Sequence, residues 1–199
     1  MIAQRDRPTL TAAEYLECEA QSPTKHEYRD GEIWAMAGTT DAHNTIALNI
    51  AVLLRNHLRG RDCQVYIADV KVRIEERNCF YYPDLLVTCE PRDRETPLYK
   101  CFPKLIIEVL SESTEAFDRG DKFNDYQTLD SLEEYVLVNT KHQRVEIFRR
   151  QEIAGWLLQT YQPSEASFVL QSLDLSLSLA AVYEAVNLEA AAATESMEL

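Results

Sequence analysis

Two runs of the sequence decide the predicted fold, Tyr81-Tyr82-Pro83-Asp84-Leu85-Leu86-Val87 and Lys104-Leu105-Ile106-Ile107-Glu108-Val109-Leu110. Both runs are short, rich in Leu, Ile and Val, and bounded by proline and charged loops, which is typical of buried strands. Each run carries one carboxylate, Asp84 or Glu108. Because an unpaired charge in an apolar core is costly, we expect these carboxylates to be protonated, paired with a cation or bound to a metal ion.

A helical segment follows the second run, predicted over about residues 118–129. Asp118, Lys122 and Tyr126 are spaced four residues apart and therefore share one face of this helix. Two carboxylates on adjacent strands, with a lysine from a nearby helix, would hold a hard divalent ion beside a phosphate-binding ammonium group. The alternatives are structural ion pairs at the carboxylates and a solvated lysine on the helix surface.

The same residues resemble a known nuclease motif. Pro83-Asp84, then Glu108 with Val109-Leu110-Ser111, resembles the core of the PD-(D/E)XK nucleases. The segment 108–114, Glu-Val-Leu-Ser-Glu-Ser-Thr, resembles one branch of that superfamily, the putative restriction endonuclease family. The resemblance covers roughly residues 26–150. It implies a restriction endonuclease-like core and a metal-dependent endonuclease that hydrolyses DNA.

The resemblance also implies roles for particular residues. Asp84 and Glu108, with the backbone carbonyl of Val109, would ligate Mg²⁺ or Mn²⁺. Leu110 stands where the motif usually has lysine, so Lys122 becomes the candidate catalytic lysine.

Four further residues are possible auxiliaries of this site: Glu27, His43, Asp118 and Tyr126. Glu27 would complete the metal shell or would be a surface strand residue. His43 lies near the active site or caps a helix. Tyr126 contributes to the site or only packs its ring.

Composition limits the class of protein. The chain has 199 residues, 46% of them hydrophobic, which suits one globular domain over 1–199. There is no run of 18 apolar residues and no apolar segment near the N-terminus, so we expect neither a membrane span nor a secretory signal. The cysteines form no C-x-x-C pair, and we expect five free thiols and a cytoplasmic location; they are Cys18, Cys63, Cys79, Cys89 and Cys101.

The net charge of −13 argues against tight DNA binding, because proteins that neutralise phosphates usually present a basic face. Local basic clusters or homodimerisation could still supply one; the clusters are Arg55, Arg59 and Arg61, and Lys141, Arg144, Arg149 and Arg150. The alternative function is therefore a non-catalytic DNA-binding or dimeric interaction module with a nuclease fold. An electropositive groove would favour the enzyme, and a smooth acidic surface would favour the module.

The fold class expected is α/β or α+β, with a mixed, mainly antiparallel sheet flanked by helices. Thr11 and Glu14 form a capping box for a helix over 11–21, and Asp30-Gly31 favours a tight hairpin turn. A second helix is predicted over 42–58, and alternation predicts a strand over 64–74 with a bulge near Ala68. Later strands are predicted at 134–139, 143–150, 156–161 and 168–179, with a C-terminal hairpin, a short helix over 180–186 and a frayed tail over 190–199.

Overall fold

A six-stranded sheet forms the centre of the computed structural model, which describes residues 9–36, 38–153 and 155–188. Strands β8 and β9 run parallel, and all other neighbours in this sheet run antiparallel. The mixed, mainly antiparallel sheet and the α+β class are therefore confirmed. In order across the sheet, the strands are β11 (Gly155–Tyr161), β10 (Val145–Gln151), β9 (Glu134–Val138), β8 (Leu105–Val109), β6 (Leu85–Thr88) and β3 (Gln64–Ile67).

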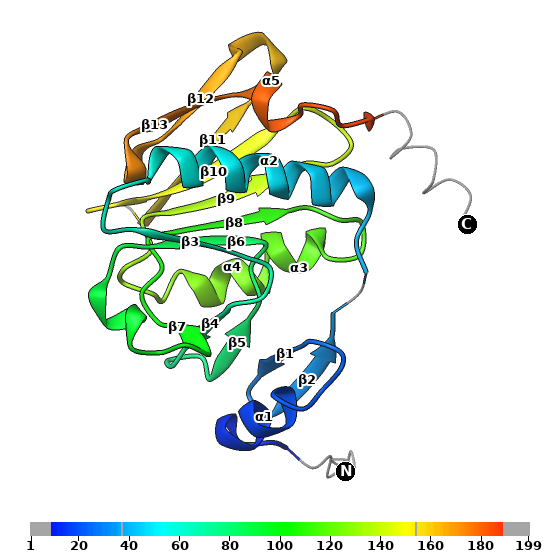
Figure 1. Cartoon of the computed structure of the whole chain (residues 1–199), viewed down its shortest axis with the longest axis vertical. Coiled ribbons are helices and arrows are strands. Elements are labelled where there is room, and N and C mark those ends of the chain that lie inside the picture. The colour runs from blue at the N-terminus through cyan, green and yellow to red at the C-terminus, as the bar shows by residue number, and fades with distance from the viewer. Residues whose placement is uncertain (1–8, 37, 154, 189–199) are drawn as a thin grey trace.

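Helices cover both faces of this sheet. The long helix α2 (Asp41–His57) lies on one face, and the short helices α3 (Glu115–Arg119) and α4 (Asp121–Tyr126) lie on the other (Figure 1). Within β8, the side chains of Leu105, Ile107 and Val109 belong to the core cluster that includes α2, whereas Ile106 packs with residues of α4. Because side chains alternate along a strand, Glu108 lies on the α4 face.

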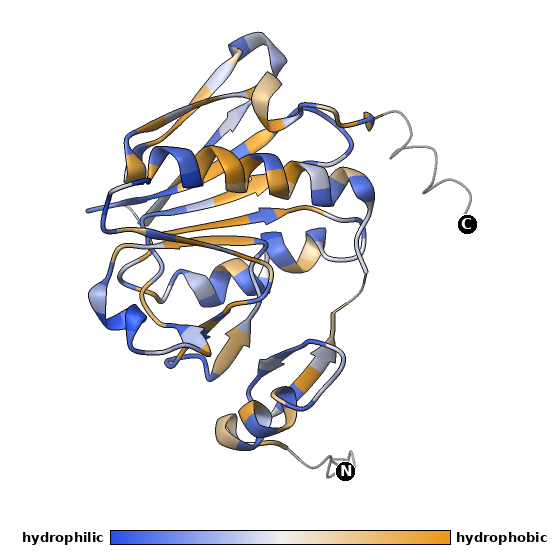
Figure 2. Cartoon of the chain, in the orientation of Figure 1, coloured by the Kyte–Doolittle hydropathy of each residue, from blue (hydrophilic) through white to orange (hydrophobic). Residues whose placement is uncertain are grey.

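The helix α2 is fixed by its cap and by its apolar side. Thr40 is the N-cap, and its side chain accepts a hydrogen bond from the backbone N–H of His43. Ile46, Ile50 and Leu54 are buried against the sheet at helical spacing. Figure 2 shows hydrophobic residues concentrated along the inner strands and α2, with hydrophilic residues toward the outer surfaces.

A second sheet of five strands carries the N-terminal part of the chain. Its order is β2 (Glu32–Ala35), β1 (His26–Arg29), β5 (Cys79–Tyr81), β4 (Lys71–Ile74) and β7 (Tyr99–Lys100), with β4 and β7 parallel. The hairpin between β1 and β2 turns at Asp30 and Gly31, which have φ values of 48° and 95°, as a two-residue turn of this kind requires. The helix α1 (Ala12–Glu19) has the expected capping box at Thr11 and Glu14.

The C-terminal part forms a hairpin, but not between the predicted strands 156–161 and 168–179, because β11 pairs with β10 in the central sheet. Strands β12 (Ser167–Leu170) and β13 (Leu175–Ser178) pair, and the helix α5 (Leu179–Val182) follows them. The predicted single strand over 168–179 is wrong, because Asp174 adopts a left-handed φ of 52° and turns the chain between two strands. The predicted tail over 190–199 lies outside the described residues. Within the described ranges there are also three short 3₁₀ helices: η1 (Pro91–Arg94), η2 (Pro163–Glu165) and η3 (Gln171–Leu173).

Two predicted strands are divided between the two sheets. Residues 64–74 form β3 in the six-stranded sheet and β4 in the five-stranded sheet, because Ala68 has a positive φ of 52° and turns the chain. The Tyr81–Val87 run is split into the end of β5 and the start of β6. Pro83 lies at this break and has no backbone N–H to give to a ladder. Asp84 is therefore placed where the chain passes from one sheet to the other.

Two other predictions need correction. The helix predicted over 118–129 is two helices, α3 and α4, which are separated at Gly120 (φ −109°, ψ −101°). The prediction of five free thiols is wrong, because Cys63 and Cys89 form a disulfide. Cys63 precedes Gln64 and Cys89 follows Thr88, and since Gln64 and Thr88 are cross-strand partners, the two cysteines face each other where β3 begins and β6 ends. The other three cysteines are free: Cys18, Cys79 and Cys101.

Candidate active site

Strand pairing brings Asp84 and Glu108 together. Leu85 in β6 is opposite Ile107 in β8, so Asp84 and Glu108 are the next pair at the end of this ladder. The backbone N–H of Asp84 donates to Glu108 Oε2 over 3.1 Å, and the backbone N–H of Val109 donates to Asp84 Oδ2 over 2.7 Å. Each carboxylate is thus oriented by the backbone of the neighbouring strand.

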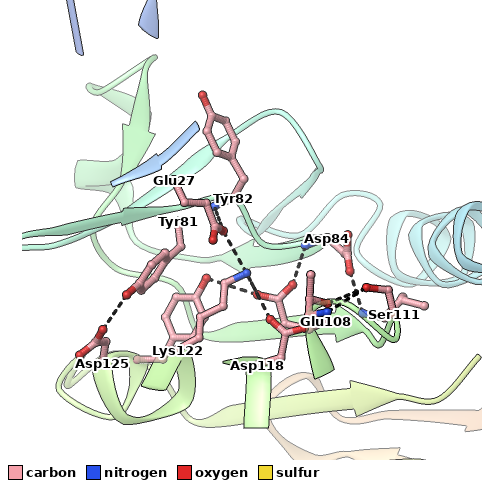
Figure 3. A network of polar contacts seen from close by, with 12 residues as sticks. Glu27, Tyr81, Tyr82, Asp84, Glu108, Ser111, Asp118, Lys122 and Asp125 are labelled. Carbon is pink, nitrogen blue, oxygen red and sulfur yellow. Dashed lines mark hydrogen bonds and ion pairs between the residues drawn. The ribbon is translucent and has the colours of Figure 1, made fainter. Parts of the chain in front are cut away.

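Lys122 lies among three carboxylates. Its Nζ is 3.0 Å from Glu108 Oε1, 3.0 Å from Glu27 Oε1 and 3.5 Å from Asp118 Oδ1 (Figure 3). The lysine is only 5% exposed. The predicted alternative of a solvated lysine is therefore wrong, because the first turn of α4 points this side chain toward β8 and not toward water.

The surroundings shift the acidity of these groups. Burial raises the pKa of Glu108 well above its usual range, although the Lys122 ammonium opposes this rise. Burial likewise raises the pKa of Asp118, and the Lys122 ammonium again opposes the rise. Burial alone would lower the pKa of Lys122, but the carboxylates of Glu108, Glu27 and Asp118 raise it well above the ordinary value. Lys122 is therefore charged, and Glu108 and Asp118 bind protons more readily than exposed carboxyls do.

Glu27 and His43 reach the same site from other elements. The Tyr82 backbone N–H donates to Glu27 Oε1 over 3.1 Å, so β1 contributes a carboxylate from the second sheet. His43, in the first turn of α2, places Nε2 3.1 Å from Asp84 Oδ2. Its Nδ1 is buried and makes no hydrogen bond to any described residue. The structure thus places both residues beside the carboxylate pair.

Tyr126 contacts the carboxylate pair and also packs its ring. Its hydroxyl donates to Glu108 Oε1 at 3.4 Å, and its ring packs against Tyr81 and Tyr135 with centroids 5.6 and 5.5 Å apart. A second network anchors the same helix: Tyr81 donates to Asp125 Oδ2 over 2.6 Å, and Arg29 Nε lies 3.0 Å from that oxygen. Sequence reasoning missed this network, which fixes α4 against β1 and β5.

The charge balance suits a divalent cation. Asp84, Glu27, Glu108 and Asp118 supply four carboxylates and Lys122 one ammonium, so full ionisation would leave three uncompensated negative charges. Among the described residues, no three His, Cys, Asp or Glu side chains already form a metal-binding group. The oxygens of Asp84 and Glu108 are instead satisfied by amide, imidazole and ammonium groups. A hard ion fits this donor set, provided that it displaces some of these internal partners.

The site opens into a large cleft. A cavity of about 920 Å³ is bordered by the carboxylate pair, Lys122, His43 and residues of both sheets. The cavity is also lined by Trp34 of β2 and by the Ser111–Thr114 turn. A cleft of this volume can admit several nucleotide units or a small organic ligand.

Two of the basic residues suggested for phosphate binding have structural roles. Arg149 is buried, and its Nε donates to Glu134 Oε1 over 2.8 Å. Arg150 donates to the backbone carbonyls of Leu132, Gln127 and Leu129. These guanidinium groups hold β10 to its neighbours and do not form a basic face.

The fold and the site define a restriction endonuclease-like α+β protein with an acidic cluster and one buried lysine at the junction of two sheets. The chain belongs to the Uma2 family, described as putative restriction endonuclease, whose model matches residues 12–181. No helix in the described part of the chain is both long enough and apolar enough to cross a bilayer.

Three relatives place the chain among similar proteins. An uncharacterized protein of Synechocystis sp. is 38% identical over 176 residues, covering 88% of this chain and 92% of that protein. A second uncharacterized Synechocystis protein is 36% identical over 151 residues, covering 75% of this chain and 85% of its own length. A crystal structure described as a putative nuclease of DUF820 from Anabaena variabilis has a TM-score of 0.72 at 16% identity, covering 87% of this chain and 97% of that one. This last similarity supports the fold.

Proposed function

We propose that this protein is a divalent-metal-dependent endonuclease that hydrolyses DNA phosphodiester bonds in the cleft beside Asp84 and Glu108. The observation that carries the proposal is the position of Lys122, whose ammonium lies 3.0 Å from Glu108 although Leu110 occupies the motif position. Two carboxylates on adjacent strands and a charged donor are the groups that metal-assisted phosphoryl hydrolysis requires.

In this proposal the carboxylates of Asp84 and Glu108, with the Val109 carbonyl, would hold Mg²⁺ or Mn²⁺. The bound ion would supply charge neutralisation at the phosphate and a more acidic water molecule. Lys122 would donate to the phosphate oxygen on which negative charge develops, or would orient the attacking water. His43, which contacts Asp84 Oδ2 over 3.1 Å, would hold that carboxylate in one orientation.

The carboxylates around Lys122 do not form the electropositive groove that was expected of the enzyme, but they are the oxygen donors that a divalent ion requires, and for this reason we prefer the enzyme to the non-catalytic module. Four carboxylates against one ammonium would repel a phosphate backbone when no cation is present. A module that binds DNA without metal would gain nothing from this acidic cluster. An enzyme uses it, because the ion that the cluster binds also attracts the phosphate.

The test is a cleavage assay on single-stranded, duplex and supercoiled DNA with Mg²⁺ or Mn²⁺. We expect the wild type to cleave at least one substrate and Asp84→Asn to lose cleavage with its circular dichroism spectrum unchanged. The amide of asparagine can still accept the Val109 N–H bond, so this variant removes the charge and keeps the local geometry. Cleavage that is equal in the variant, or that survives EDTA, would contradict the proposal.

A further inference from the structure

Trp34 places an exposed indole at the proposed active-site cleft. It lies in β2, is 46% exposed and borders the same cavity as Asp84, Glu108 and Lys122. A large aromatic side chain in such a position exposes a flat apolar surface to whatever enters the cleft.

The hairpin register places this indole next to the catalytic cluster. Trp34 pairs directly with Glu27 across the antiparallel strands β1 and β2, so the two side chains point to the same face. Directly opposite residues have Cβ atoms roughly 5 Å apart. Glu27 Oε1 in turn lies 3.0 Å from Lys122 Nζ. The indole therefore neighbours a residue that contacts Lys122, which is proposed to act on the phosphate.

The indole of Trp34 differs from that of Trp156 in its aromatic and cationic contacts. Among the described residues, none places an aromatic ring or a cation against Trp34. Trp156 shows the contrast: its ring packs on Phe123 with centroids 5.5 Å apart and lies under the Arg150 guanidinium at 4.6 Å. Trp156 therefore contributes to the core, whereas Trp34 is 46% exposed at the cleft.

The cations near Trp34 have internal partners. Lys25 forms an ion pair with Asp69, and Arg29 is bound by Asp121 and Asp125. Affinity at this end of the cleft would therefore have to come from contacts other than free positive charge. Stacking of a base on an aromatic ring supplies such affinity, and every base has a face that can stack.

We propose that Trp34 is a stacking platform for an unpaired base, so that the DNA bound next to the catalytic cluster is single-stranded or locally unstacked. This inference rests on the proposed function. The faces of a base inside a duplex are covered by its neighbours, and the indole can reach them only when the base is out of the stack. The platform thus selects for unpaired DNA. Stacking does not require a basic surface, which is consistent with the net charge of −13.

The test uses tryptophan fluorescence and binding of a labelled oligothymidylate in Ca²⁺, with gel analysis to verify that the DNA stays intact. Trp156→Phe leaves Trp34 as the only tryptophan of the chain, and we expect saturable quenching of its emission by the oligothymidylate. Trp34→Ala should weaken this binding about tenfold, and Trp34→Phe should retain most of it. Binding of a duplex of the same length should not change in either variant.

The outcomes separate this inference from the proposed function. Absence of quenching at saturating oligothymidylate, or equal binding by Trp34→Ala, overturns the platform. Cleavage of DNA in Mg²⁺ or Mn²⁺ by a protein whose Trp34→Ala variant binds equally well would leave the nuclease standing without the platform. Quenching with no cleavage of any DNA would leave the platform standing and overturn the proposed hydrolysis.

Discussion

Lys122 Nζ lies 3.0 Å from Glu108 Oε1, although the lysine belongs to α4 and the glutamate to β8. Leu110, two residues after Glu108, is buried in a cluster with Phe123 and Tyr126. The position at which the nuclease motif has its lysine is thus part of the core. The helix α4, which covers this core, delivers an ammonium group to Glu108 on the same face of the sheet.

This geometry predicts the effect of Lys122→Met. Cleavage should fall by the equivalent of about 2–4 kcal/mol in transition-state stabilisation, since one preorganised charged donor is lost. Binding of Mn²⁺, measured by calorimetry, should be nearly unchanged, because the proposed ligands remain. Circular dichroism should verify that the variant is folded.

Lys100→Met is the matched control for this variant. Lys100 is also buried, but its ammonium donates to the Asp93 and Thr96 carbonyls and does not border the cleft. The kcat of the Lys100→Met variant in the cleavage assay should stay close to that of the wild type. Full activity in Lys122→Met, or an equal loss in Lys100→Met, would contradict a catalytic role for Lys122.

The raised pKa of Glu108 predicts how stability depends on pH in EDTA. The unfolded glutamate titrates near the ordinary pKa of 4.5, and the folded one titrates at a higher pH. Between these two pKa values the folded state binds more protons than the unfolded chain, so the free energy of unfolding should decrease as pH rises through this window. Glu108→Gln should show a smaller decrease, measured by urea denaturation at several pH values.

Added Mn²⁺ should reverse this trend if the cluster binds it. A divalent ion that binds the folded state stabilises it by mass action and replaces the protons on the carboxylates. The stabilisation by Mn²⁺ should therefore be larger at the upper end of the pH window than at its lower end. Stabilisation that does not depend on pH, or that persists in an Asp84→Asn and Glu108→Gln double variant, would place the ion elsewhere.

The cysteines give a fourth prediction. With a disulfide between Cys63 and Cys89, a thiol count on denatured protein should rise from three to five after reduction. In the folded protein, burial raises the pKa of the Cys79 thiol to about 11, so little thiolate forms at neutral pH and alkylation of Cys79 should be slow. Cys18 is exposed and should react first. A count of five before reduction would contradict the disulfide.

The sequence predicted the carboxylate pair because the pattern of each strand is local. Glu108 is flanked by apolar residues throughout β8, and only the strand geometry is needed to assign it to one face. The hairpin turn was also predictable, since Asp30-Gly31 fixes a two-residue connection and hence the pairing of Glu27 with Trp34. The position of Trp34 beside the site could have been inferred from this register.

Features that depend on long-range geometry could not be predicted. The phase change near Ala68 has the pattern of a bulge, but there the chain leaves one sheet for another. The disulfide needs the register of β3 against β6, which no local pattern specifies. The break between α3 and α4 at Gly120 was likewise not predicted. One continuous helix was expected from spacing alone.

Arg149 provides the last prediction, since the sequence offered it as a phosphate-binding residue and the structure buries it. Its Nε donates to Glu134 Oε1, and the Glu134 carboxylate also accepts the backbone N–H groups of Gln171 and Ser172. Arg149→Met would leave Glu134 buried without its cation, which should lower the free energy of unfolding by about 3–5 kcal/mol in urea. Arg92→Met, at a solvent-exposed ion pair with Glu90, should change it far less, because water screens this pair. A loss of DNA affinity in Arg149→Met with unchanged stability would instead restore the phosphate-binding role.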